Sequence, residues 1–181
     1  MQTATTSVNI ENTIIPTVDF KLRVKNTAGD YEWKEVSTRD IFDGKKIVFF
    51  SLPGAFTPTC SSTHLPGYEA MYDEFKALGV DEIYCISVND AFVMNAWIKD
   101  QGVQNIKVIP DGSAELTRKL GMLVKKDNLG FGMRSWRFSA FVDNGVIKKA
   151  FVEPGFSDDC PSDPFEVSDS GTMLEYLQNN K

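Results

Sequence analysis

The stretch Lys46-Ile-Val-Phe-Phe-Ser-Leu52-Pro53-Gly-Ala-Phe-Thr-Pro-Thr-Cys60 decides the expected fold. Residues 46–52 form an apolar run that predicts a buried strand, and the proline- and glycine-containing segment after it predicts a turn into a helix. A thiol at the start of a helix faces unpaired backbone N–H groups and the positive end of the helix dipole, which favour the thiolate. A buried structural cysteine is the alternative interpretation, but two prolines make this segment a rigid loop rather than a packed element. We therefore expect Cys60 to be reactive.

Strands and helices alternate along the rest of the chain. Apolar residues recur at helical spacing between Cys60 and Gly79, and Pro66 should kink or break that helix in its first turns. In chain order we expect a hairpin of residues 20–24 and 31–36, a helical turn at 38–42, a strand at 46–52, the helix after Cys60, a strand at 83–88, a helix at 91–101, a strand at 106–109, a helix at 114–120, strands at 137–142 and 146–152, and a last helix at 170–178.

Local signals refine three of these elements. Asp90 should cap the helix at 91–101, and Ser113 should cap the helix that reaches Leu120. The apolar side of the first of these helices is expected to carry Phe92, Val93, Ala96 and Trp97. A glycine-rich loop covers residues 129–133, and Asp143-Asn-Gly145 predicts a tight hairpin turn. Together the pattern predicts an α/β fold with a mixed sheet, in a single domain of residues 1–181.

Composition excludes several classes of function. The chain has 181 residues, of which 42% are hydrophobic, and a net charge of −6 with scattered Lys and Arg, which argues against nucleic acid and anionic membranes as partners. No apolar run is long enough to span a bilayer, and residues 1–7 lack the pattern of a secretory signal. The 3 cysteines are too few and too dispersed for a disulfide framework, which favours the cytoplasm. Their spacing, with one histidine, does not fit a zinc site, so we expect no metal.

The segment Pro53-Gly-Ala-Phe-Thr-Pro-Thr-Cys60-Ser-Ser-Thr-His64-Leu-Pro-Gly-Tyr68 closely resembles the active-site region of peroxiredoxins, specifically the type II or peroxiredoxin-five group. Segments 80–90, 92–97 and 137–139 agree in the same order, and the likeness covers nearly the whole chain. The resemblance implies a thioredoxin-like fold with a mixed sheet flanked by helices and an N-terminal β-hairpin. It also implies an antioxidant thiol peroxidase that reduces hydrogen peroxide and alkyl hydroperoxides and needs no cofactor.

The same resemblance implies roles for four residues. Cys60 matches the peroxidatic cysteine, Thr57 its hydroxyl partner, Pro53 the residue that shields the thiolate, and Arg137 the guanidinium beside it. The chemistry suits these residue types, because charge grows on the leaving oxygen of the peroxide and donors such as the Thr57 hydroxyl and Arg137 can stabilise it. Without the resemblance, Thr57 would be read as a turn hydroxyl and Arg137 as a surface strand charge.

Two further residues are candidates for supporting roles. Arg134 precedes Arg137 by three residues and can lie near the pocket. His64 follows Cys60 by four residues, which places it on the same helix face. As the only histidine it is the one possible partner for a Cys–His dyad, although a hydrogen bond that holds the loop is the favoured interpretation.

The sequence leaves open how the oxidised cysteine is reduced. Cys85 lies in an apolar strand, but its separation of 25 residues from Cys60 matches the second cysteine of plant-type members. Cys160 lies roughly where other members have a resolving cysteine, and its acidic neighbours should raise its pKa. We predict instead that glutathione, with or without glutaredoxin, resolves Cys60, with thioredoxin as second choice, because residues 163–174 resemble glutathione-linked bacterial members. No fused glutaredoxin domain is expected within this chain.

Other functions and partners remain to be weighed. A redox-sensing binding or chaperone module that uses Cys60 is the main alternative, because the same oxidation step would serve it. A thiol–disulfide oxidoreductase is disfavoured, since Thr57 occupies the place of the first cysteine of a C-x-x-C motif. By analogy with other members we expect a homodimer formed by loops around the active site, with the Phe131 region as a contact. The preferred hydroperoxide is not specified by the sequence.

Overall fold

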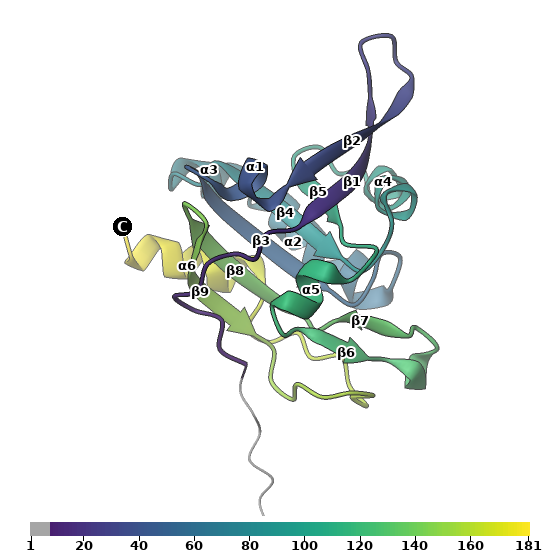
Figure 1. Ribbon diagram of the computed structural model, residues 1–181. Helices are drawn as coiled ribbons and strands as arrows, with labels where there is room; N and C mark the ends of the chain where they lie inside the picture. Colours follow the sequence, from purple (N-terminus) through teal and green to yellow (C-terminus); the bar gives the residue numbers. More distant parts are fainter. Residues whose placement is uncertain (1–7) are drawn as a thin grey trace, which may run out of the picture.

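The central sheet has five strands in the order β5-β4-β3-β8-β9 in the computed structural model, which describes residues 8–181 (Figure 1). Parallel pairing joins β3 to β4 and β4 to β5, whereas β3, β8 and β9 pair in antiparallel order. This is the mixed sheet of a thioredoxin-like α/β fold, as predicted. The strands are β3 (Lys46–Leu52), β4 (Glu82–Ser87), β5 (Lys107–Pro110), β8 (Phe138–Asp143) and β9 (Val146–Val152).

Side chains of the central strand alternate between the two faces of this sheet. Ile47 and Phe49 join a core with residues of α1 (Thr38–Phe42) and α5 (Glu115–Lys119). Val48 and Phe50 point the other way. They pack in a core that also contains Cys60 and residues of α2 (Leu65–Ala70), α3 (Tyr72–Ala77), α4 (Ala91–Asp100) and α6 (Ser170–Asn179). The reactive-cysteine segment therefore lies on the face covered by four helices.

Two hairpins lie outside the central sheet. The first, formed by β1 (Asp19–Lys25) and β2 (Tyr31–Ser37), confirms the alternation in the sequence and projects from the body in Figure 1. The second pairs β6 (Leu123–Lys125) with β7 (Met133–Ser135) around the short helix η2 (Asp127–Leu129). Residues 129–133 were predicted to form a glycine-rich loop, but strands β6 and β7 on either side of it were not predicted. Strands of three residues carry too little alternation to be recognised in a sequence.

The helix that follows Cys60 differs from its predicted form. It starts with a π-helical turn, η1 (Cys60–His64), in which the N–H of Leu65 donates to the carbonyl of Cys60. Pro66 lies in the first turn of α2, where its missing N–H costs nothing. Pro66 was predicted to kink this helix or mark a break in its first turns, and the change from η1 to α2 does fall directly before it. A second break, between α2 and α3, falls at Met71 and was not predicted.

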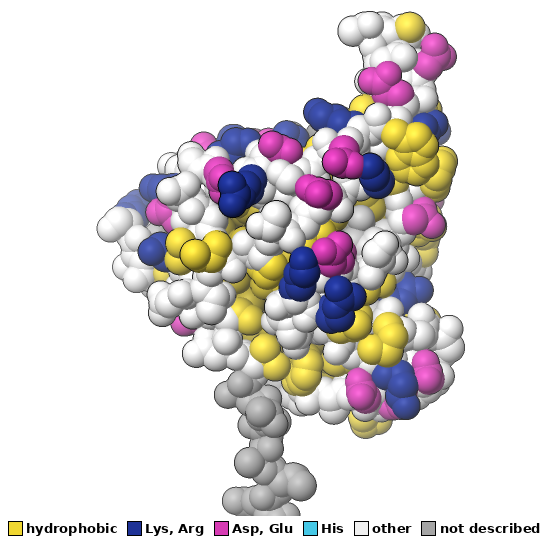
Figure 2. Space-filling model, in the orientation of Figure 1, with side chains coloured by type: hydrophobic (Ala, Val, Ile, Leu, Met, Phe, Trp, Pro, Cys, Tyr) yellow, Lys and Arg dark blue, Asp and Glu magenta, His cyan; other side chains and the backbone are white. Residues whose placement is uncertain are grey.

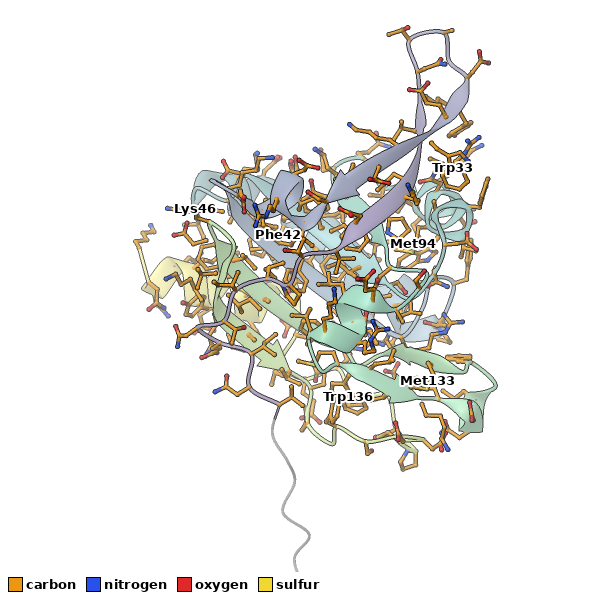
Figure 3. The ribbon with its side chains drawn as sticks, in the orientation of Figure 1. Trp33, Phe42, Lys46, Met94, Met133 and Trp136 are labelled. Atoms are coloured by element: carbon orange, nitrogen blue, oxygen red, sulfur yellow. The ribbon has the colours of Figure 1, made fainter. Side chains whose placement is uncertain are left out.

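The predicted apolar side of α4 was partly wrong. Asp90 caps the helix as expected, its carboxylate accepting the N–H of Val93. The buried residues are Ala91, Met94 and Trp97. Phe92, which was expected to be buried, is 59% exposed and packs edge-on against Trp33 of the projecting hairpin, with ring centroids 5.6 Å apart. Trp33 is labelled in Figure 3.

The cap of α5 also differs from the prediction. Ser113 is exposed, and the helix follows Ala114, whose φ of 58° is left-handed and which makes no side-chain cap. The buried carboxylate of Asp111 replaces the expected cap. It accepts the N–H groups of Leu116 at 3.2 Å and Thr117 at 2.8 Å, and the hydroxyl of Thr117 at 2.7 Å. A cap that reaches back from four residues before the helix has no simple sequence signal.

Charges do not gather on the face of the molecule shown in Figure 2. Lys and Arg alternate there with Asp and Glu, and apolar side chains lie between them. No helix in the described part of the chain is both long enough and apolar enough to cross a membrane. The expected lack of a secretory signal rests on residues 1–7, which lie outside the described residues.

We expect Asp111→Ala to lower the free energy of unfolding by about 2 kcal/mol or more, because it leaves buried N–H groups at the start of α5 without an acceptor. Urea denaturation of the wild type and the variant measures this loss. The matched control is Ser113→Ala, which should stay within about 0.5 kcal/mol of the wild type. Equal losses in the two variants would restore Ser113 as the cap.

Candidate active site

The Cys60 thiol lies in a turn that continues β3 into a helix. The chain becomes helical at residue 58, and Pro58 takes the first helical position, where a proline is well tolerated. The N–H of Ser61 donates to the carbonyl of Thr57 at 3.0 Å, so Cys60 sits in the first turn, as predicted. The side chain of Cys60 has no exposed surface. A residue outside the turn also stabilises it, because the N–H of Ala55 donates to Asn89 Oδ1 at 3.0 Å.

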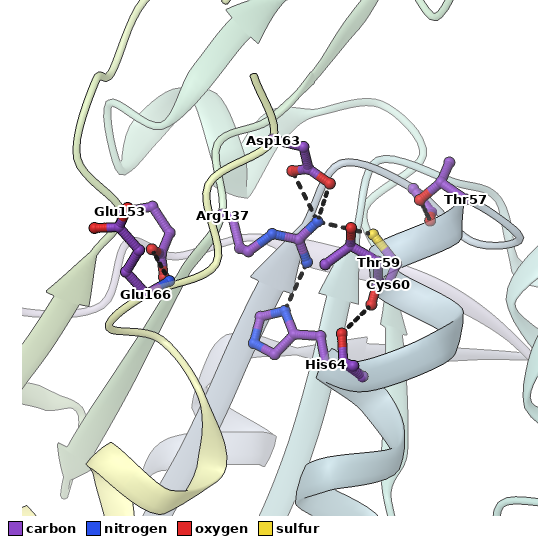
Figure 4. Close-up of polar contacts among 10 residues, drawn as sticks. Thr57, Thr59, Cys60, His64, Arg137, Glu153, Asp163 and Glu166 are labelled. Atoms are coloured by element: carbon purple, nitrogen blue, oxygen red, sulfur yellow. Dashed lines mark hydrogen bonds and ion pairs between the residues drawn. The ribbon is translucent and has the colours of Figure 1, made fainter.

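A buried guanidinium faces the sulfur. Arg137 precedes β8 and is only 1% exposed, and its Nη2 lies 3.4 Å from Cys60 Sγ (Figure 4). The same Nη2 donates to both carboxylate oxygens of Asp163 at 2.9 Å, and Nη1 lies 2.9 Å from His64 Nδ1. Burial acts to lower the pKa of Arg137, but Cys60 and Asp163 outweigh it, so the net pKa is raised. Arg137 stays charged, and it brings three acceptors together.

His64 contacts Arg137 rather than forming a dyad with the cysteine. Its Nε2 lies 3.1 Å from the carbonyl oxygen of Ser168, and its Nδ1 faces the guanidinium. Burial, together with the positive charge of Arg137, holds the pKa of His64 well below its usual range. The ring is therefore neutral at physiological pH. These contacts agree with the predicted structural hydrogen bond that holds a loop.

Thr57 and Pro53 lie in the same turn as Cys60. The Thr57 hydroxyl donates to the carbonyl oxygen of Gly54 at 2.7 Å, so its proton is engaged and its lone pairs remain available. Pro53 is buried, and its carbonyl accepts from Arg134 Nη1 at 3.4 Å. A Cβ at Gly54 would lie 2.7 Å from Arg134 Nη1, so a side chain at this position would displace the end of Arg134.

Arg134 connects the β6–β7 hairpin to the cysteine turn. Its Nε donates to the carbonyl oxygen of Phe131 at 3.1 Å while its Nη1 reaches Pro53. Burial lowers the pKa of Arg134, and the nearby Cys60 opposes that change. The structure thus brings Arg134 to the rim of the site, although Arg137 alone reaches the sulfur among residues 8–181.

The loop that follows β9 supplies two groups that the sequence analysis did not place in the site. Asp163 pairs with Arg137, and its side chain is 39% exposed. The Phe165 ring lies over the guanidinium at 5.6 Å and 4.9 Å from the His64 ring. Residues 163–174 were singled out only for their resemblance to bacterial members. A contact 26 residues from Arg137 in the chain leaves no local pattern.

The other two cysteines lie in different environments. Cys85 is fully buried in β4, opposite Phe50, and burial, reinforced by Cys60, raises its pKa well above the usual value. The expectation that acidic neighbours raise the pKa of Cys160 was wrong. Burial does act in that direction, but hydrogen bonds from Ser162, first, and Ser157 outweigh it, so its pKa is lowered. All three cysteines are free thiols.

The described residues contain no group of three or more His, Cys, Asp and Glu side chains that could hold a metal ion. The groups that meet at the site are a sulfur, a guanidinium, a neutral imidazole and a carboxylate. A sulfur that lies 3.4 Å from a permanent cation is suited to nucleophilic attack.

Comparisons with known proteins agree with this arrangement. The sequence profile of the Redoxin family matches residues 15–163. Peroxiredoxin sll1621 of Synechocystis is 60% identical over 168 residues, covering 91% of this chain and 89% of that protein. Peroxiredoxin-2D of Arabidopsis thaliana is 47% identical over 143 residues, covering 78% and 84%. The crystal structure of the Plasmodium falciparum antioxidant protein, a 1-Cys peroxiredoxin, superposes with a TM-score of 0.89 at 39% identity and covers 94% and 100%.

The chain therefore belongs to the Redoxin family. Within it, the chain is a peroxiredoxin of the type II, peroxiredoxin-five-like subfamily, and hence a thiol-dependent peroxidase with an antioxidant function. Both the predicted fold and the predicted activity are confirmed.

Proposed function

We propose that Cys60 is the peroxidatic residue of this peroxidase. The observation that carries the proposal is the 3.4 Å approach of Arg137 Nη2 to Sγ in a pocket closed to solvent. The thiolate attacks one oxygen of a hydroperoxide, so an S–O bond forms as the O–O bond breaks and the sulfur is oxidised by two electrons. The other oxygen leaves with the electron pair of that bond and takes up a proton. Water or an alcohol is released, and a sulfenic acid remains on Cys60.

The proposed roles of the neighbouring groups follow from their hydrogen bonds. Arg137 stabilises both the thiolate and the charge that grows on the leaving oxygen, because a guanidinium keeps its proton throughout. The Thr57 hydroxyl already donates to Gly54, so we assign it an acceptor role toward the O–H of the peroxide. Pro53 closes one side of the turn and excludes water from the sulfur. His64 and Arg134 support Arg137 and the turn.

We propose that an external thiol returns the sulfenic acid to the thiol, with glutathione and glutaredoxin ahead of thioredoxin. Cys85 supports this choice, because a buried thiol of raised pKa is a poor nucleophile. The similarity to a 1-Cys peroxiredoxin of known structure points the same way. Three free thiols suit a reducing compartment, and we propose the cytoplasm.

We expect Cys60→Ser to lose peroxide turnover completely, and Cys85→Ser and Cys160→Ser to keep it within about twofold of the wild type. The assay follows consumption of hydrogen peroxide or an alkyl hydroperoxide with glutathione and glutaredoxin, and in parallel with thioredoxin. Loss of turnover in Cys160→Ser would identify a resolving cysteine in the protein and overturn the one-cysteine mechanism. Turnover in Cys60→Ser would remove Cys60 from the reaction.

Arg137→Ala should slow oxidation of Cys60 by peroxide about 100-fold, because it removes the only side-chain donor that reaches the sulfur among residues 8–181. Stopped-flow fluorescence or trapping of the sulfenic acid measures this rate. Arg137→Lys keeps the charge but not the fork of donors, and should recover part of the loss. Arg134→Ala should be affected less than Arg137→Ala. Equal losses in the two alanine variants would place both arginines at the sulfur.

We also propose that the protein forms a homodimer through the loops around the active site. Several large apolar side chains are exposed, and Met133 on β7, labelled in Figure 3, is one of them. Four of these side chains are Phe56 (54% exposed) in the cysteine turn, Phe92 (59%) in α4, Leu129 (54%) in η2 and Met133 (47%) in β7. Exposed apolar side chains that gather in one patch mark interaction surfaces, and the proposed dimer would cover these side chains.

Sedimentation velocity tests the dimer. We expect Phe92→Asp to shift the protein from dimer to monomer, because it introduces a charge into an apolar contact. Ile14→Asp is the control, since Ile14 is 77% exposed but lies in the N-terminal segment beside Val146. A wild type that sediments as a monomer, or a Phe92→Asp variant that stays dimeric, would contradict the proposed surface.

A further inference from the structure

A second carboxylate, Glu153, lies behind the active site and is almost completely buried. It directly follows β9 and is 1% exposed. Its carboxylate oxygens accept three successive backbone N–H groups, from Glu166 at 2.6 Å, Val167 at 3.0 Å and Ser168 at 2.8 Å. Burying a charge is costly, but several charge-assisted hydrogen bonds offset the loss of hydration. Glu153 therefore holds residues 166–168 in one conformation.

The segment held by Glu153 ends at a carbonyl that is used twice. The carbonyl oxygen of Ser168 accepts the hydroxyl of Tyr68 at 2.9 Å and faces His64 Nε2 at 3.1 Å. On the other side of this carbonyl, Asp169 caps α6 by accepting the N–H of Thr172 at 3.0 Å. The Ser168 carbonyl is thus fixed from both directions, by the carboxylate before it and by the helix cap after it.

This carbonyl determines which nitrogen of the histidine carries the proton. The Ser168 carbonyl can only accept and the Arg137 guanidinium can only donate, so Nε2 bears the hydrogen and Nδ1 presents a lone pair. The opposite tautomer, or an imidazolium, would set an N–H against the N–H of Arg137 Nη1. With Nδ1 as acceptor, Nη1 is anchored at 2.9 Å, and Nη2 is directed to Cys60 Sγ at 3.4 Å.

We propose that Glu153 is a positioning residue of the active site, which acts through residues 166–168 and the tautomer of His64 to aim Arg137 at Cys60. This inference rests on the proposed role of Arg137 beside the peroxidatic cysteine. The main chain of Glu153 adds to the same support, because its N–H donates to the carbonyl of Arg137 at 3.2 Å and its carbonyl accepts Trp136 Nε1–H at 2.8 Å. Glu153 therefore holds Arg137 from two sides.

The single histidine of the chain allows a direct test by ¹⁵N NMR of the reduced protein. In the wild type we expect one neutral ring with the proton on Nε2, which persists well below pH 6.5 because burial and Arg137 disfavour the imidazolium. The charged groups near the ring are Arg137 and, beyond it, Asp163 and Glu153. A wild-type ring that carries its proton on Nδ1, or that is an imidazolium at pH 7, overturns the proposal without any variant.

Glu153→Gln keeps the size of the side chain but points an amide NH₂ group at backbone N–H donors. We expect a mixture of His64 tautomers, a His64 pKa below that of the wild type because the hydrogen bond to the Ser168 carbonyl that raises it is weakened, and oxidation of Cys60 by peroxide slowed about tenfold. Glu166→Gln is the matched control. It removes one charge from the same segment, but its side chain is exposed, and it should match the wild type in all three measurements.

A folded Glu153→Gln variant with the wild-type tautomer and rate would show that Glu153 only anchors the loop, and would overturn the proposal. If that variant does not fold, Glu153→Asp gives the same readouts, since it keeps the charge but not the reach. The tautomer measurement needs no peroxide. If Cys60 of the wild type does not react with peroxide, the proposed function is refuted. The His64 tautomer still tests the contact chain from Glu153 to Arg137 independently.

Discussion

A guanidinium that is 1% exposed is the constraint on which the rest of the site depends. Buried charge is stable only where its donors are paired, so Arg137 requires acceptors on several sides. The protein supplies a sulfur from the helix start, an imidazole nitrogen from the next helical turn and a carboxylate from the loop after β9. Two of these acceptors lie in η1, and the third lies much later in the chain. The geometry around Cys60 is therefore a property of the folded chain rather than of the cysteine motif alone.

Asp163 and Glu153 make different contributions to the surroundings of this guanidinium. Asp163 contacts Arg137 directly and is partly exposed, so water screens it. Glu153 is fully enclosed and reaches the guanidinium only through a peptide segment and a ring. Both belong to the stretch that the sequence shows as an acidic, proline-containing loop. Acidic residues in such a stretch are usually solvated. Here Asp163 pairs with the buried Arg137, and Glu153 is buried because three backbone N–H groups donate to its carboxylate.

Sequence patterns predicted the elements whose signals are local. Alternation along residues 20–36, the turn at Asp143-Asn-Gly145 and the apolar run at 46–52 all correspond to observed strands. Errors arose where tertiary contacts decide. Phe92 leaves the core for a contact with Trp33, and Asp111 takes over the cap expected from Ser113. A hydrophobic pattern along one helix contains no information about Trp33 or Asp111, because both residues lie outside the helices that they contact.

The candidate site shows the same division. Cys60, Thr57 and Pro53 are adjacent in the chain, so a short motif names them together, and the family resemblance adds Arg137. Asp163 and Glu153 were not predicted, because their partners are 26 residues away or are backbone groups that every residue possesses. The π-helical turn at Cys60–His64 was also missed. Its one-residue widening changes where the histidine ring points, and no composition signal encodes it.

The complete enclosure of Cys60 has a kinetic consequence. No reagent can contact a sulfur that has no exposed surface, so the cysteine turn has to open locally before the sulfur reacts. The segments that cover the sulfur are held by hydrogen bonds and one ion pair rather than by covalent links. The closed state protects the Cys60 sulfur from unwanted reaction. The rate at which the turn opens limits the rate at which oxidised Cys60 can be reduced.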